Sequence, residues 1–394
     1  MSSESERPAA YAWYALTLLT AVYVLNFLDR TLIYILFTPI KKEMAFSDLQ
    51  LALLGTTSFV IFYTLLGVPF GWLADRVPRK VIIGAGLAVW SLFSGLTGFA
   101  HTFWSIFFCR MMVGVGEATL GPAALSLLSD YFPPRMRATS QSIYSSGIAI
   151  GGGLAFFLGG WIGQSYGWRW AFYLLGFPGL VLAALLFGLR EPPRGRTDAA
   201  AAPAADWRLL FRSAPLLYLF AGYALVGLAS NNLSIWGTAF YIRMHGVSLK
   251  QVGTGAGVFA LAIGAPAMIA SGWFADRVKR RMAFTAAAAL ISVPLWIALI
   301  LLPSLVTVVV ANVFVYALAI LWVGPATADV TEIAGPRLRG LAIGVFFSIV
   351  NITAYAVGST VIGKLSDVWG LRNALLVCPV ACAGGALLLW LGSK

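Results

Sequence analysis

Residues 103–137 read FWSIFFCRMMVGVGEATLGPAALSLLSDYFPPRMR, and this segment identifies the class of protein. It is a long apolar run that nevertheless carries Arg110 and, seven residues later, Glu117. Seven residues make two helical turns, so both side chains project from the same face of one helix. A charge this deep in hydrocarbon costs several kcal/mol unless it is paired or hydrated. We therefore predict a membrane-spanning helix whose charged face lines a polar cavity.

The composition of the whole chain extends this interpretation. The 394 residues are 60% hydrophobic and 11% charged, and the mean hydropathy is +0.85. Apolar runs of about twenty residues recur from one end to the other, as transmembrane helices require. The short alternating segments that are typical of β-barrel strands are not visible. The sequence thus predicts an all-α polytopic membrane protein.

The net charge of +12 indicates orientation rather than a nucleic-acid partner. Of the 27 Lys and Arg residues, 18 lie at the termini and in alternate loops, whereas 7 lie in the opposite loops. This asymmetry is the positive-inside pattern, which predicts that both termini face the cytoplasm. We expect a monomer in a bacterial inner membrane, with the lipid bilayer and a small substrate as its partners.

Metal and enzyme chemistry have little support in the sequence. The chain has three cysteines, all in apolar segments, and two histidines, His101 and His245, without an acidic partner motif nearby. These residues show no metal-ligand spacing and form no nucleophile–base pair. We predict no bound metal, no cofactor other than protons as a coupling ion, and no enzymatic activity.

Hydropathy divides the chain into twelve expected spans. They cover residues 12–38, 49–74, 81–100, 103–132, 138–166, 170–190, 210–242, 249–274, 282–302, 305–333, 340–366 and 373–391. Most connections are very short, but residues 191–208 are rich in proline and alanine and indicate a flexible linker. We predict an N-terminal six-helix bundle over 1–190, a cytoplasmic linker over 191–208 and a C-terminal six-helix bundle over 209–394.

The two halves of the chain repeat each other. The segment GWLADRVPRK at 71–80 returns as GWFADRVKRR at 272–281, and Gly121-Pro122 returns as Gly324-Pro325. The offsets lie between 201 and 203 residues. Six spans that start on the same side in each half form two parallel, pseudo-symmetric repeats, and matching Gly-Pro interruptions point to a binding site near the membrane midplane. This design is typical of a transporter.

Four charged residues are expected to meet near that midplane. Asp29 and Arg30 lie about eighteen residues into the first span, and adjacent helical residues diverge by about 100°. We expect each to find a partner on span four, where Arg110 and Glu117 complete a neutral cluster of two acids and two bases. The protonation of a buried carboxylate depends on its burial and on nearby guanidinium groups, so small rearrangements can load or release a proton. The alternative is a static network that only fixes helix packing, with Arg110 extending toward the outer interface.

The doubled loop motif, the six-plus-six layout and the pattern Arg110-x-x-x-Gly114-x-Gly116 resemble the Major Facilitator Superfamily across essentially the whole chain. Within it, Asn26-Phe27-Leu28-Asp29-Arg30 and Val113-Gly114-Val115-Gly116-Glu117-Ala118 are similar to the Spinster lipid transporters, above all the bacterial members. The resemblance implies the twelve-helix Major Facilitator fold. It also implies that Asp29 and Glu117 carry the protons that drive alternation between inward and outward states.

The repeated loops suggest gates. Their charges would bias the two states by making and breaking ion pairs, as a population shift requires. The expected gating residues are Asp75, Arg76, Arg79, Asp130, Asp276, Arg277, Arg280 and Glu332, with Asp130 and its counterpart Glu332 pairing with the loop arginines. Plain positive-inside anchoring is the alternative, which explains the arginines but not the paired aspartates.

The C-terminal half differs in character from the N-terminal half. Asn231 and Asn232 stand opposite Asp29 and Arg30, and the surrounding spans are rich in aromatic residues. A cavity with one charged and one aromatic wall suits a molecule with a charged head and an apolar tail. The substrate-binding residues that we predict are Arg30, Arg110, Asn231, Asn232, Trp236 and Tyr355.

We therefore expect a proton-coupled secondary transporter that moves an amphiphile, of the lysophospholipid or sphingoid phosphate class, by alternating access. The first alternative is a proton-driven multidrug efflux antiporter, in which Glu117 attracts cationic drugs. Ala155-Phe156 replaces the Gly-Pro of the superfamily's antiporter motif, which leaves antiport open. A membrane-embedded acyltransferase or a lipid receptor without transport are alternatives from other classes.

Overall fold

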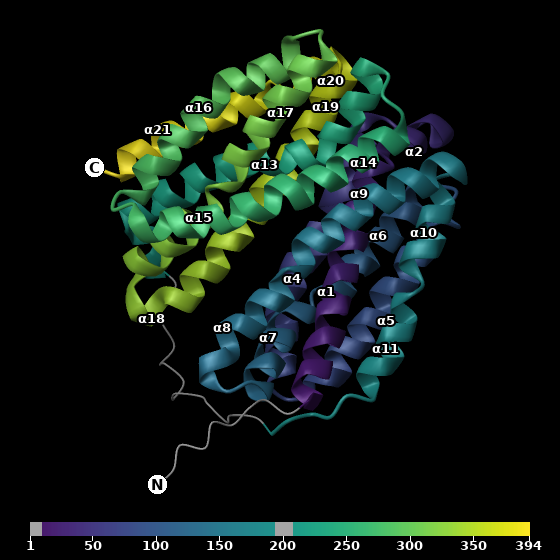
Figure 1. The fold of residues 1–394 in the computed structure, drawn as a ribbon, viewed down its shortest axis with the longest axis vertical. Helices are drawn as coiled ribbons and strands as arrows, with labels where there is room; N and C mark the ends of the chain where they lie inside the picture. The colour runs from purple at the N-terminus through teal and green to yellow at the C-terminus, as the bar shows by residue number, and fades with distance from the viewer. Residues whose placement is uncertain (1–9, 194–207) are drawn as a thin grey trace.

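The computed structural model describes residues 10–193 and 208–394, which contain helices and no β-strand. The helices form two bundles, one from each half of the chain (Figure 1). The all-α polytopic prediction is therefore confirmed. The predicted linker at 191–208 lies for the most part outside the described residues, so the domain boundaries stay a prediction.

Each bundle contains the six spans of its half, several of them divided into shorter helices. In the N-terminal bundle these are α1 (Ala10–Ile35), α2 (Phe37–Met44), α3 (Asp48–Ala52), η1 (Leu53–Thr57), α4 (Ser58–Ala74), α5 (Arg79–Thr97), α6 (Phe103–Glu117), α7 (Leu120–Tyr131), α8 (Pro134–Ser145), α9 (Gly147–Ser165), α10 (Trp168–Gly176) and α11 (Gly179–Phe187). The C-terminal half has α12 (Arg208–Arg212), α13 (Ala214–His245), α14 (Leu249–Phe259), η2 (Ala260–Gly264), α15 (Ala265–Arg277), α16 (Arg281–Leu301), α17 (Leu305–Ile320), α18 (Val323–Asn351), η3 (Ile352–Gly358), α19 (Ser359–Trp369), α20 (Leu371–Ala374) and α21 (Val377–Gly392).

Eleven helical segments of the described chain are long and apolar enough to cross a membrane, and the fourth predicted span is the one that this criterion misses. It is divided between α6 and α7 by a turn at Ala118 and Thr119. We expected the break at Gly121-Pro122, but it lies just before this pair. Proline is tolerated in the first turn of a helix, so this pair opens α7, and Gly324-Pro325 opens α18 in the same way.

Three spans contain a turn of π-helix, which is wider than an α-helical turn. These turns are η1 in span two, η2 in span eight and η3 in span eleven. Each lies where its span contacts the other half: η1 contacts η3, and η2 contacts α9. Such turns in α-helices occur mostly at functional sites.

Small residues bring the two halves into close contact along α9 and α14. A Cβ atom on Gly253 would lie 2.4 Å from the carbonyl oxygen of Phe156, and one on Gly160 would lie 2.9 Å from the Cα of Gly253. Close approach of this kind lets helices in a membrane gain van der Waals contact over their backbones. The glycines therefore hold one side of the interface between the bundles.

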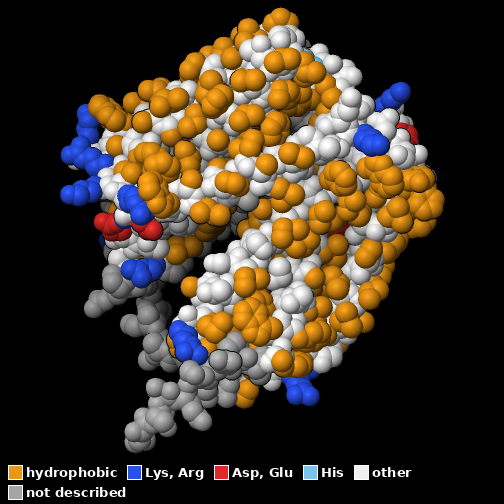
Figure 2. All heavy atoms as spheres, viewed as in Figure 1, with side chains coloured by type: hydrophobic (Ala, Val, Ile, Leu, Met, Phe, Trp, Pro, Cys, Tyr) orange, Lys and Arg blue, Asp and Glu red, His pale blue; other side chains and the backbone are white. Residues whose placement is uncertain are grey.

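The bundles meet at one end and diverge at the other (Figure 1). We call the end where α1 and α13 begin the open end, and the end with α2, α3 and α20 the closed end. Toward the closed end, one hydrophobic core includes residues of both halves, such as Phe37 and Trp236, whose rings are 5.2 Å apart. Toward the open end, each bundle has a core of its own. Figure 2 shows the resulting hollow between the bundles.

We expect Gly253→Ala to destabilise the protein, because its new methyl group would meet the backbone of α9. Overpacking of this kind costs about 1–3 kcal/mol, which lowers Tm by several degrees in a thermal unfolding measurement in detergent. Gly255→Ala on the same helix is the matched control, since nothing lies within 4 Å of its Cβ position. An equal drop in Tm for both variants would contradict the proposed packing.

Candidate functional site

An ion pair joins the first and fourth spans on the wall between the bundles. Arg30 of α1 donates hydrogen bonds to one carboxylate oxygen of Glu117 on α6, from Nη2 at 2.7 Å and from Nε at 3.1 Å. The Arg30 side chain is 16% exposed and that of Glu117 is fully buried. Arg30 thus lies between Glu117 and the hollow. The sequence analysis expected a partner for Arg30 on span four, and Glu117 is that partner.

Aromatic rings surround the guanidinium of Arg30. Its Cζ atom lies 4.9 Å from the ring centre of Phe27 and 4.7 Å from those of Phe59 and Tyr63. Cations are attracted to the faces of aromatic rings, and more strongly where water is excluded. The rings therefore help to hold Arg30 in place, and, in addition to Glu117, they attract its guanidinium.

Asp29 and Arg110 lie behind this pair, inside the N-terminal bundle, and both are 0% exposed. One Asp29 carboxylate oxygen accepts a hydrogen bond from Ser94 Oγ at 2.7 Å, and the other has no partner among the described residues. Arg110 donates to the backbone carbonyl of Asp29 at 3.3 Å rather than to its carboxylate. The expected Asp29–Arg110 ion pair is therefore replaced by a hydrogen bond to a serine on the third span.

Arg110 is placed neither on the wall of the hollow nor toward the outer interface. Its Nε and Nη2 atoms are buried without a hydrogen-bond partner in the described chain. Its charge interacts electrostatically with those of Asp29 and Glu117. The four charges thus form one cluster, but in this conformation only Arg30 among them is exposed for a ligand to reach.

Two of the four predicted binding residues of the C-terminal half face the cluster. The Tyr355 hydroxyl donates to Asn231 Oδ1 at 2.6 Å, and Tyr355 is close enough to Arg30 to interact electrostatically. The other two, Asn232 and Trp236, are 0% exposed. Asn232 donates to the carbonyl of Ala354, and Trp236 donates to Ser359 Oγ. We therefore reinterpret Asn232 and Trp236 as residues that pack α13 against η3 and α19.

A cavity of about 170 Å³ lies between α13, α14 and α17, with Phe156 of α9 as one wall. Its lining is mostly apolar and includes Leu233, Val252, Phe259, Leu305 and Val309. Two polar atoms on its wall, the Tyr241 hydroxyl and Asn312 Oδ1, are buried without a partner in the described chain. The positions of Asn231, Ser234 and Tyr241 share one face of α13, so that face runs from the charged cluster along the cavity.

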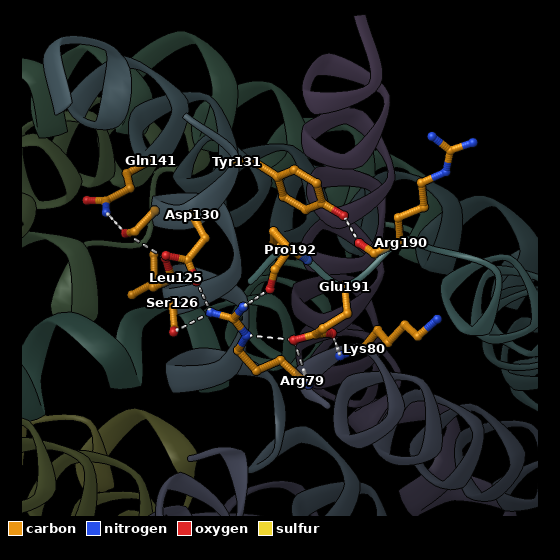
Figure 3. Close-up of polar contacts among 11 residues, drawn as sticks. Arg79, Lys80, Leu125, Ser126, Asp130, Tyr131, Gln141, Arg190, Glu191 and Pro192 are labelled. Atoms are coloured by element: carbon orange, nitrogen blue, oxygen red, sulfur yellow. Dashed lines mark hydrogen bonds and ion pairs between the residues drawn. The ribbon is translucent and has the colours of Figure 1, made fainter. Parts of the chain in front are cut away.

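At the open end, Arg79 of α5 pairs with two carboxylates of the N-terminal bundle (Figure 3). It pairs with Asp130 at 2.5 Å and with Glu191 at 2.8 Å, and it also donates to Ser126 Oγ and to the carbonyl of Pro192. The predicted contact between Arg79 and Asp130 is therefore present. Glu191, which also accepts from the backbone amides of Arg79 and Lys80, was missed by the sequence analysis.

The C-terminal counterpart is shifted by one residue from the predicted one. Arg281, not Arg280, contacts Glu332 at 2.6 Å and Asp329 at 3.6 Å. Arg280 precedes α16 and is exposed, whereas Arg281 is the first residue of the helix and donates to the carbonyl of Ala275. Asp276 is also exposed.

Two of the remaining gate candidates contact a ring of their own helix. Arg76 and Arg277 each lie over a tryptophan of their own helix, Trp72 and Trp273, at 3.6 Å and 4.1 Å. Asp75 lies at the end of α4. The ion pairs that the structure describes at the open end each join residues of one bundle.

The closed end is sealed by a residue that the sequence analysis did not select. Asp48 pairs with Arg243 of α13 at 2.8 Å and with Lys41 at 2.6 Å, and it accepts a hydrogen bond from Ser366 Oγ of α19. Asp367 of α19 accepts from the backbone amides of Asp48 and Leu49, at 2.7 and 3.0 Å. A carboxylate of one bundle thus caps a helix of the other, where unpaired amides favour negative charge. Asp48 follows Ser47 in a capping box, which is the only local signal in the sequence.

The comparisons with known proteins agree with this geometry. The family described as the Major Facilitator Superfamily matches residues 19–354. An MFS-type efflux pump of Mycolicibacterium smegmatis is 29% identical over 97% of this chain and 92% of its own length. Protein spinster of Drosophila melanogaster is 30% identical over 59% of this chain, and the match covers 39% of that relative. The chain therefore spans less than half the length of this spinster protein.

A solved structure is similar over nearly the whole chain. It is that of a bacterial homologue of the human lysosomal transporter Spinster, in an inward-facing and unoccupied conformation. The two structures align with a TM-score of 0.90 at 27% sequence identity, over 98% of this chain and 97% of the other.

We expect Asp48→Asn to open the closed end, because it leaves Arg243 without its charged partner. Removing one member of a buried pair costs about 2–5 kcal/mol, which corresponds to at least a tenfold change in the ratio of the two states. Spin labels at Lys42→Cys and Lys250→Cys, both exposed at the closed end, report this as a population at longer distance. The three native cysteines are replaced for this measurement.

Glu43→Gln is the control for the closed end. It removes the Glu43–Arg169 ion pair, which joins residues of one bundle at the same end of the molecule. We expect the label distance to stay unchanged in this variant. A closed end that stays shut in Asp48→Asn would show that the seal depends on other contacts.

Proposed function

The chain belongs to the Major Facilitator Superfamily and is a transporter rather than an enzyme, and we propose its mechanism and its substrate class. In this proposal it is a proton-coupled secondary transporter of an amphiphilic lipid. The single observation that carries the proposal is the Arg30–Glu117 pair on the wall of the hollow, with Asp29 behind it, one of whose carboxylate oxygens has no partner among the described residues. A buried acid that can exchange its paired cation for a proton would couple the uptake of that proton to the binding of an anionic ligand by the released cation.

Proton binding at Glu117 would free Arg30. While the acid is ionised, the guanidinium is held by Glu117 and three rings. Protonation removes the charge attraction, so Arg30 becomes available to an anionic ligand. Asp29 lies beside the same cluster and interacts electrostatically with Glu117, so the protonation of one acid changes that of the other. Binding of an anion and of a proton are thereby linked.

The ends of the molecule support alternating access. The closed end is held by ion pairs and a helix cap between bundles, whereas the described ion pairs of the open end lie within each bundle. In the opposite state the closed-end contacts must break. The positive-inside pattern places the open end in the cytoplasm, and the similar Spinster homologue is inward-facing.

The two walls of the site suit the two parts of a lysophospholipid or sphingoid phosphate. Arg30 is the cation that an anionic head can reach, and the apolar cavity between α13, α14 and α17 has the character that an acyl chain needs. The face of α13 that carries Asn231, Ser234 and Tyr241 would guide the chain from one to the other. Both parts of the ligand are then bound at once.

Multidrug efflux is the second candidate, because the Mycolicibacterium efflux pump is similar over 97% of this chain. In that case Glu117 would bind cationic drugs. Transport of a lysolipid panel and of cationic dyes into proteoliposomes separates the two functions.

We expect Glu117→Gln to abolish the dependence of lysolipid transport on an imposed pH gradient, because an amide cannot bind and release the proton. Asp29→Asn should have the same effect while the protein remains folded. The measurement is transport into proteoliposomes with and without the gradient. A gradient-driven rate within twofold of wild type in the double variant would refute proton coupling through this cluster.

The control is Glu332→Gln, which neutralises an exposed acid at the open end. It should change the rate of transport without removing its dependence on the pH gradient.

We expect Gly237→Leu to impair the transport of lysolipids with long acyl chains more than that of lysolipids with short ones. Gly237 lines the cavity, and the nearest side-chain atom is 3.8 Å from its Cβ position, so leucine fits and takes the space of the ligand. Losing contact with a few methylene groups, at about 0.8 kcal/mol each, raises KM for an octadecanoyl lysolipid about tenfold or more. Transport of the decanoyl homologue should change little. Gly272→Leu, at a position with no atom within 4 Å, is the control.

A further inference from the structure

A stripe of partly exposed residues leads along α1 from the open end to Arg30. Its members are Thr20, Tyr23, Phe27 and Arg30. These positions are separated by three or four residues, so they share one face of the helix. Seven residues separate Tyr23 from Arg30, which is about 10 Å along the axis. A ligand that enters from the open end passes this face before it reaches the charged cluster.

Two further tyrosines join the stripe from neighbouring helices. The ring of Tyr144, at the end of α8, stacks on that of Tyr23 with centres 4.2 Å apart and an angle of 10° between the planes. Tyr63 of α4 stacks on Phe59 and also contacts the guanidinium of Arg30. The hydroxyl of Tyr144 lies close enough to those of Tyr23 and Tyr63 for a negative charge on one to affect the others. Three phenol groups from three helices thus gather on the open-end side of Arg30.

Hydroxyl groups in this region lack the partners that buried groups normally have. Tyr144 is 2% exposed, and its hydroxyl has no hydrogen-bond partner among the described residues. The hydroxyls of Thr20, a member of the stripe, and of Thr64, which follows Tyr63 in the sequence, are also buried without one. Leaving a buried hydroxyl unpaired is unfavourable, and such groups call for an explanation. A ligand that accepts their hydrogen bonds supplies one.

The charges nearby indicate which ligand this is. Arg30 is the cation that acts on Tyr23, and Glu117, the acid that acts on it, is already paired with Arg30. Phenol hydroxyls are donors as well as acceptors, and an oxygen-rich anion accepts several hydrogen bonds at once. A cationic group here would have to compete with Arg30 for Glu117. The surroundings therefore favour an anion.

We propose that Tyr23, Tyr63 and Tyr144 form a second head-group subsite, which holds the anionic head of the substrate before it reaches Arg30. This inference rests on the proposed function, because it takes the substrate to be an amphiphile with an anionic head. It adds a specificity site at which hydrogen bonds from three hydroxyls select an oxyanion. The head then moves about two helical turns to Arg30 when Glu117 takes up a proton.

The test is the affinity of hydroxyl-deletion variants for three amphiphiles with the same tail. Tyr144→Phe and the triple variant with Tyr23→Phe and Tyr63→Phe keep the stacked rings and remove the donors. The probes are oleoyl lysophosphatidate, neutral oleoyl glycerol and cationic oleylamine, measured by equilibrium binding to the purified protein in detergent. Inorganic phosphate is a fourth probe, which tests whether the subsite takes a free anion or only a lipid head.

We expect Tyr144→Phe to weaken lysophosphatidate binding about fivefold and the triple variant at least twentyfold, with the other two amphiphiles within twofold of wild type. Tyr14→Phe, an exposed position on α1, is the control and should change nothing. In transport, Tyr144→Phe should raise KM for lysophosphatidate and leave kcat and the pH dependence near wild type.

Equal losses for the anionic and neutral amphiphiles would overturn the subsite, because they would show a packing effect. So would unchanged lysophosphatidate affinity in the triple variant, or no binding of lysophosphatidate by wild type. A protein that binds it through these hydroxyls but transports it without regard to the pH gradient would keep the subsite and lose the proton coupling. The two proposals therefore fail separately.

Discussion

The energetic cost of ionised side chains inside an apolar bundle governs the rest of this structure. Arg30 and Glu117 reduce that cost by pairing at 2.7 Å, and the rings of Phe27, Phe59 and Tyr63 add further attraction for the cation. Removing either charge alone would leave the other buried and unpaired, which is strongly unfavourable. The pair therefore persists unless a proton takes the place of Arg30 at Glu117 or an anionic ligand takes the place of Glu117 at Arg30.

Among the contacts that join the bundles, two kinds differ in what separating them requires. Along α9 and α14, glycines allow backbone contact that is short in range and insensitive to charge. At the closed end, Asp48 and Asp367 make charged contacts that are directional and can be replaced by water when the bundles part. In the alternating access that we propose, the charged contacts of the closed end would separate while the close packing along α9 and α14 keeps the halves together.

The sequence predicted the local parts of the site better than the long-range ones. The seven-residue spacing on span four and the divergence of Asp29 and Arg30 identified the charged cluster, because helical periodicity fixes directions within one helix. It could not show that the Asp29 carboxylate meets Ser94, since that contact depends on how α5 packs against α1. The seal at Asp48 was missed for the same reason: its partners in the other bundle lie 195 and 318 residues away. The repeat suggested Arg280, but the start of α16 gives the role to Arg281.

The three π-helical turns have a mechanical consequence. Each places a wide, less regular turn inside a span that borders the interface, with α-helix on both sides of it. A long helix with such a turn behaves as two stiff rods joined by a pivot. The molecule is therefore able to change shape by flexing individual spans as well as by rocking its halves as solid blocks. Small bends at η1, η2 and η3 can widen or narrow the passage around Arg30 while the glycine contacts of α9 and α14 stay in place.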